Sequence, residues 1–151
     1  MSKSKAPTPV ISKPSSSVAQ ITIDGVSYNV DELTEAAKQQ LGNVRLVDQE
    51  LARLQRQRAI AGVARTAYVN AASAQLPREV TPAKDGGRSI VIDGVAHDWD
   101  SLGEKVHALL AGIRAADQEL ARLQAQISLA QTARGTFSNI VKQNLPKRDA
   151  A

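Results

Sequence analysis

The chain has 151 residues, no cysteine, a formal net charge of +4 and only 3% aromatic residues. These values exclude a disulfide scaffold and cysteine-ligated zinc, and they favour closely packed helices, filled by Leu, Ile, Val and Ala, over a thick sheet core. The positive charge is concentrated in segments that we expect to be flexible, which argues against a protein whose folded body is a dedicated nucleic-acid-binding surface.

The N-terminal segment, residues 1–19, is rich in Ser, Pro and Lys, and we expect it to be disordered. It lacks the apolar stretch of a signal peptide, and the chain has no apolar run long enough for a transmembrane helix. The sequence therefore predicts a soluble protein that has no membrane contact and is not secreted by a signal peptide. We expect it in the cytoplasm or within a virion or other assembly.

The next segment, ITIDGVSYNV from residue 21, alternates apolar and polar residues around Asp24-Gly25. Asp-Gly between β-branched residues favours a two-residue type I′ turn, because that turn requires positive φ at both central positions. The segment IVIDGVAHDW from residue 90 has the same pattern around Asp93-Gly94. The sequence predicts a small β-hairpin at each place.

A long helix is predicted after each hairpin. Asp31 and Asp100 stand where helix N-caps are expected, and Leu76-Pro77 and Leu145-Pro146 should end the helices because proline stops a helix. Gly42 leaves two alternatives open for the first helix, a straight course or a kink.

The second helix has a heptad seam in which all but one position is apolar, as in a coiled coil. The first helix has a weaker seam, with Arg58 and Arg65 at core-type positions. We expect the interaction seam to include Leu51, Leu54, Leu120, Leu123, Ile127 and Phe137.

Arg65 and Arg134 occupy matching seam positions, and a buried arginine needs a carboxylate partner. We interpret them as a polar layer that sets the register of the helices. The alternative is a pair of rim arginines that contact a partner.

The octapeptide DQELARLQ occurs at Asp48–Gln55 and again at Asp117–Gln124. The register of 69 residues holds without a gap over about 57 residues, roughly 25 of them identical, which indicates a tandem duplication. The predicted fold is mainly α: two tandem β-hairpin-plus-long-helix repeats, with the helices packed as an antiparallel coiled coil or small bundle. The predicted segments are repeat 1 at 20–77, a linker at 78–89, repeat 2 at 90–146 and a disordered tail at 147–151.

The repeated unit resembles a family of short bacterial and phage proteins of unknown function. Members of that family look like one copy of the unit, a hairpin followed by a long helix with a D-x-E-[IL]-A-R-L-Q segment. The match is best over Ile21–Pro77 and extends to Ile90–Pro146, where His97 and Phe137 replace the two tyrosines. The resemblance implies a shared fold and a bacterial or phage setting, and it implies no activity.

One cluster, His97, Asp98 and Asp100, has the residue types of a metal or acid–base site. The first unit does not repeat it, so we interpret it as a solvated hairpin edge. The glutamates of DQELARLQ, Glu50 and Glu119, have arginines at i+3, and the acidic residues are expected to form a solvated helix face with them. We therefore predict no catalytic, cofactor-binding or metal-binding residues, and we predict that the chain is not an enzyme.

The leading hypothesis is a non-enzymatic helical structural or protein-interaction module that binds a protein partner or self-associates, in a phage or bacterial assembly. The alternative is a nucleic-acid-associated accessory protein that uses its lysine-bearing tail together with Arg53, Arg56 and Arg58.

Overall fold

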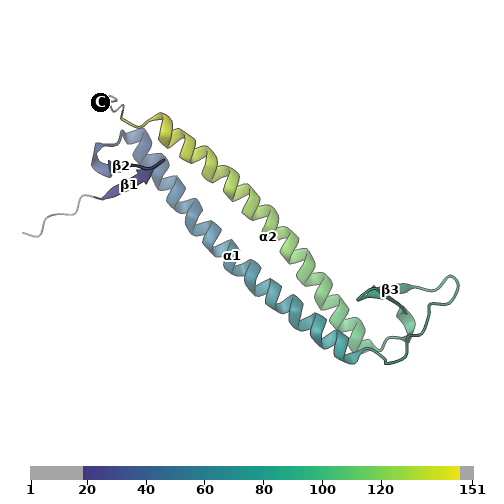
Figure 1. Ribbon diagram of the computed structural model, residues 1–151. Coiled ribbons are helices and arrows are strands. Elements are labelled where there is room, and N and C mark those ends of the chain that lie inside the picture. The colour runs from purple at the N-terminus through teal and green to yellow at the C-terminus, as the bar shows by residue number, and fades with distance from the viewer. Residues whose placement is uncertain (1–18, 147–151) are drawn as a thin grey trace, which may run out of the picture.

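The computed structural model describes residues 19–146, in which two long helices pack side by side and a small hairpin lies at each end of the pair (Figure 1). The predicted tail at 147–151, and the tail predicted at 1–19 except for its last residue, lie outside the described residues. The elements in chain order are β1 (Gln20–Ile23), β2 (Val26–Asn29), η1 (Val30–Glu32), α1 (Glu35–Gln75), β3 (Ser89–Ile92), β4 (Val95–Asp98), η2 (Trp99–Ser101) and α2 (Glu104–Gln143).

Both hairpins turn at Asp-Gly. Asp24 and Gly25 have φ values of 50° and 80°, and Asp93 and Gly94 have 50° and 78°. Positive φ at both central residues is what the predicted type I′ turn requires. Each hairpin is a separate two-stranded antiparallel sheet, with β1 paired to β2 and β3 paired to β4.

The helices begin later than the sequence predicts, so the assignment of Asp31 and Asp100 as N-caps is wrong. Asp31 lies in the 3-10 turn η1, and Thr34 caps α1 instead by accepting a hydrogen bond from the Ala37 N–H at 3.1 Å. Leu33, between them, is extended and almost fully buried. The chain is therefore still extended at this buried leucine, and the first helical turn forms only after it.

The two helices are antiparallel. Thr34, which caps α1, also donates a hydrogen bond to the carbonyl of Asn144 just after α2, at 3.2 Å. At the other end of the pair, Arg65 of α1 binds Asp117 of α2. The 41 residues of α1 form one continuous helix through Gly42, about 60 Å long at 1.5 Å per residue. α1 ends directly before Leu76-Pro77, where proline was expected to end it.

The centre of the helix pair is apolar. Leu54 and Leu123 are essentially inaccessible to solvent, and Ile127 packs with them. Leu54 and Leu123 are equivalent residues, meaning that they are separated by the 69-residue offset of the sequence. Further buried positions continue the contact toward both ends: Ala37, Val44, Ala72, Val106, Ala116 and Val141.

The side chain of Tyr68 of α1 lies against Gly112 of α2. A Cβ atom added to Gly112 would lie 2.9 Å from Cδ1 and Cε1 of the Tyr68 ring, closer than carbon atoms normally approach. Glycine lowers the stability of a helix relative to alanine, but at position 112 it leaves room for the close contact with the aromatic ring. The first half has Asn43 at the equivalent position.

We predict that Gly112→Ala stabilises the protein less than Gly135→Ala does. Gly135, in the same helix, has no atom within 4 Å of an added Cβ, so its replacement should raise the free energy of unfolding by about 1 kcal/mol, the difference in helix propensity. At Gly112 the same gain is offset by displacement of the Tyr68 ring. In a Tyr68→Ala background the two replacements should be equivalent. Urea unfolding measures all of these variants, and an equal gain at both glycines in the wild-type background would rule out the contact.

Candidate functional site

Two ion pairs connect the helices at equivalent places. Arg65 Nε lies 2.5 Å from Oδ1 of Asp117, and Arg134 Nε lies 2.5 Å from Oδ1 of Asp48. Arg134 is the equivalent of Arg65, and Asp117 is the equivalent of Asp48. Since the same contact is made twice with the helices exchanged, the helix pair has an approximate two-fold axis between the two ion pairs.

These arginines lie at the edge of the helix contact, where the four side chains of the two ion pairs are 43% to 50% exposed. The hydrogen bond that Arg134 donates to Asp48, and then the charge of Asp48, raise the pKa of Arg134. Exposed ion pairs contribute at most about 1 kcal/mol to stability. Their geometry is specific, however, because a slip of either helix along the other would separate all four charges.

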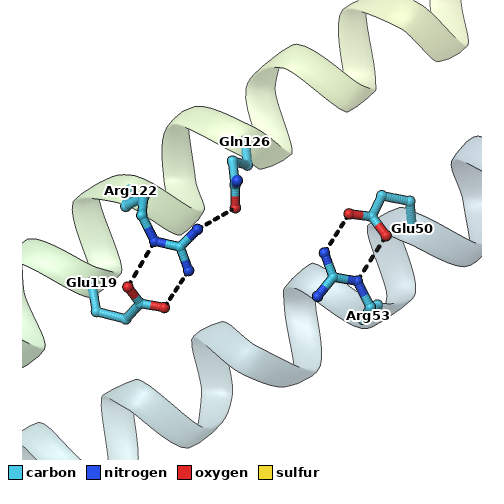
Figure 2. A network of polar contacts seen from close by, with 5 residues as sticks. All are labelled: Glu50, Arg53, Glu119, Arg122 and Gln126. Atoms are coloured by element: carbon cyan, nitrogen blue, oxygen red, sulfur yellow. Dashed lines mark hydrogen bonds and ion pairs between the residues drawn. The ribbon is translucent and has the colours of Figure 1, made fainter.

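A second set of ion pairs lies within each helix. Arg53 donates hydrogen bonds of 2.8 and 2.5 Å to the carboxylate of Glu50, and Arg122 makes the same two bonds to Glu119 and a third to Gln126 (Figure 2). These hydrogen bonds lower the pKa of both glutamates and raise the pKa of both arginines. The charge of Arg53 also opposes the rise in the pKa of Arg122, so the two guanidinium groups lie near each other on one face of the pair.

That face, here called the outer face, also exposes large apolar side chains. Leu46 and Ile60 are each seven residues from Arg53, and Leu129 is seven residues from Arg122, so they share its side of each helix. Their exposed fractions are 64%, 70% and 73%. Because nothing within the described residues covers these side chains, the outer face is a candidate contact surface.

Each hairpin borders a groove. The hairpin-2 groove, about 580 Å³, lies between β3 and the two helices, and the hairpin-1 groove, about 310 Å³, lies between β1 and the two helices. The hairpin-2 groove is lined by residues that include Ile90, Ile92, Val69, Ala72, Leu110 and Ile113. The hairpin-1 groove is lined by residues that include their equivalents Ile21, Ile23, Ser138, Val141, Leu41 and Val44.

The two grooves also differ in two of the side chains that line them near the turn. Ala72 and Ser73 line the hairpin-2 groove where the hairpin-1 groove has Val141 and Lys142. Lys142 also reaches the turn of the first hairpin, with its Nζ 3.1 Å from Oδ2 of Asp24. Serine cannot make that contact, so the wider groove stays open at the turn.

An aromatic stack lies beside the wider groove. The rings of Trp99 and His107 are parallel to within 7°, with centroids 4.3 Å apart, and His107 Nε2 lies 2.8 Å from the carbonyl oxygen of Trp99. The guanidinium of Arg88 lies 5.8 Å from the Trp99 ring. This stack was not predicted from the sequence. The signal in the sequence is that Trp99 and His107 differ from their equivalents in the first half, Val30 and Lys38.

The side chains of His97, Asp98 and Asp100 do not come together to form a site. His97 is buried, and its Nδ1 has no hydrogen-bond partner within residues 19–146, whereas Asp100 is exposed and binds Arg88 at 2.8 Å. No three His, Asp or Glu side chains in that part of the chain are placed to hold a metal ion.

The other residues singled out from sequence lie along the helix contact. Leu54, Leu123 and Ile127 are buried in it, and Leu51 packs against this cluster from a partly buried position. The predicted seam residues Leu120 and Phe137 are also only partly buried. The predicted seam positions are therefore buried to different degrees.

Comparisons of the chain with models of protein families, with curated proteins and with solved structures give no match. The resemblance to a bacterial and phage family therefore stays a prediction. Between residues 19 and 146, neither helix is apolar enough over a sufficient length to cross a membrane.

We predict that acid weakens the fold partly through Glu50 and Glu119. Their pKa values in the folded state lie below the ordinary 4.5, so their contribution to stability is present at neutral pH and is lost as the pH falls below about 4.5. The variant Glu50→Gln/Glu119→Gln should lose less stability than the wild type between pH 7 and pH 3 in urea unfolding. Arg53→Gln/Arg122→Gln, which removes the donors, should flatten the pH dependence similarly. Equal acid dependence in all three proteins would contradict the assignment.

Proposed function

We propose that the chain is a non-enzymatic helical structural or protein-interaction module, built from two tandem hairpin-plus-helix copies that pack as an antiparallel coiled coil. The repeated contacts support this proposal: the Asp48–Arg134 and Arg65–Asp117 ion pairs, and the equivalent leucines at the centre. A unit that makes its principal contacts with its own duplicate has the arrangement of a two-fold symmetric dimer joined into one chain.

The observation that carries the functional part of the proposal is the pair of grooves at opposite ends of the rod. Equivalent residues Leu41 and Leu110 line the two grooves. In the register set by the ion pairs they are separated by about 45 Å along the rod, at 1.5 Å per residue. A rigid rod with two related binding ends holds two partner elements at a fixed distance, as an adaptor or a structural spacer does.

The outer face supports self-association as a further mode of contact. Leu46, Ile60 and Leu129 are more than 60% exposed and lie on one side of the helix pair, where a second copy could cover them. The setting that we propose is the bacterial or phage assembly implied by the family resemblance, in the cytoplasm or within a virion.

A specific charge distribution supports the alternative, a nucleic-acid-associated protein. Residues 35–75 carry six basic side chains against three carboxylates, while residues 20–34 and 89–103 carry three carboxylates each and no lysine or arginine. Arg45, Arg56 and Arg58 of α1 are exposed and have no ion pair within the described part of the chain. Binding through these arginines would weaken steeply with salt.

Photo-crosslinking in the native host separates the two functions. A photoreactive amino acid at Thr22 or at Val91, which are exposed equivalents on β1 and β3, should capture the same protein, because both ends carry related grooves. The same probe at Ala59, exposed at mid-rod, should not capture that protein. Capture of nucleic acid at Arg56, lost in Arg45→Gln/Arg58→Gln, would favour the alternative. No protein adduct at either hairpin would contradict the proposed function.

A further inference from the structure

The strand β3 has an open edge. Its sheet contains only two strands, so within residues 19–146 the side of β3 away from β4 has no strand partner. Ile92 faces Val95 across the two-residue turn, and Ile90 faces His97 two positions further on. In a hairpin of this type these are the hydrogen-bonded pairs, so the N–H and C=O of Val91 point away from β4 toward the open edge.

This open edge borders the hairpin-2 groove. Ile90, Val91 and Ile92 all line it, opposite Val69 of α1 and Leu110 of α2. A mostly apolar groove, which the charged residues Arg65, Asp93, Arg114 and Asp117 also line, therefore runs beside a strand whose backbone has unused hydrogen-bonding groups. The groove volume of about 580 Å³ falls within the range of about 300–1,000 Å³ that is usual for ligand-binding pockets.

We propose that the hairpin-2 groove binds an extended peptide segment of a partner protein, which adds to β3 as a third strand and places apolar side chains at alternate positions in the groove. The proposal rests on the proposed interaction function and specifies the partner of one of its two sites. The side chains of a strand alternate between its two faces, so every second residue of the peptide would enter the groove while the others face outward. Backbone hydrogen bonds to β3 would supply affinity, and the groove would supply selectivity.

The first hairpin provides a matched comparison within the same chain. β1 also has an open edge, but its groove is about half as large and is lined by Val141 and by Lys142, which pairs with Asp24. The same peptide should therefore bind more weakly there. Exchanging the residues between the grooves, Ala72→Val/Ser73→Lys at one end and Val141→Ala/Lys142→Ser at the other, should exchange the preference.

The test uses the full chain as bait for a display library of random linear peptides. We expect enrichment of sequences with apolar residues at alternate positions. Against one enriched synthetic peptide, Ala72→Val/Ser73→Lys should weaken binding about tenfold or more, equivalent to about 1.4 kcal/mol. Ser73 is exposed, so Ser73→Lys alone is the milder variant in case the double one folds poorly, and circular dichroism checks both. Lys142→Ser should leave affinity at hairpin 2 unchanged.

A second measurement tests the strand geometry. N-methylation of the peptide residues that point their N–H groups at β3 should abolish binding, whereas N-methylation of the intervening residues should preserve it. Binding that is insensitive to N-methylation and to the groove variants would overturn the proposal, and so would the absence of any enriched peptide. Peptides that bind the outer face instead, and are lost in Leu129→Glu, would overturn strand addition while leaving the interaction function intact. Self-association of the chain lost in Ala72→Val/Ser73→Lys would identify a second copy as the occupant and would also overturn it.

Discussion

The structure depends on burying the leucine-rich side of each long helix against the other. Leu54, Leu123 and Ile127 form the enclosed middle of this contact, and full burial of each such side chain contributes about 1.5–3 kcal/mol. The ion pairs at its edge are half exposed and contribute at most about 1 kcal/mol each. The apolar contact therefore holds the helices together, while the Asp–Arg pairs fix how far one helix is displaced along the other.

This alignment determines where the rest of the chain is placed. With the helices antiparallel, the two hairpins lie at opposite ends of the rod, and each borders a groove to which both helices contribute. The same alignment separates charge, since the carboxylate-rich hairpin segments lie at the ends and the net positive helices between them. The two ends are nevertheless unequal, because Ser73 lines one groove and Lys142, paired with Asp24, lines the other.

Local signals in the sequence predicted the helices and hairpins well, whereas contacts between distant segments could not be predicted from it. Asp24-Gly25 indicates a type I′ turn because few other residue pairs accept two positive φ values, and Pro77 indicates the end of a helix because proline lacks an N–H. The N-caps were misplaced because Asp31 and Asp100 lie in 3-10 turns and the chain is extended at the buried Leu33 and Leu102, so each long helix begins only after these leucines. The Asp48–Arg134 pair, the Tyr68–Gly112 contact and both grooves join residues far apart in sequence, so no local pattern records them.

Distances between spin labels on this cysteine-free chain test the antiparallel alignment most directly. Gln39 lies nine residues before Asp48 and Gln143 lies nine residues after Arg134, so the Asp48–Arg134 pair places them beside each other in antiparallel helices. Both residues are exposed, and so is Ala108, the equivalent of Gln39. Labels at Gln39→Cys and Gln143→Cys should lie close together across the pair, and labels at Gln39→Cys and Ala108→Cys about 50 Å apart, from the 1.5 Å rise per residue. The opposite pattern, with 39 beside 108 and far from 143, would show that equivalent positions lie side by side in parallel helices and would contradict the account.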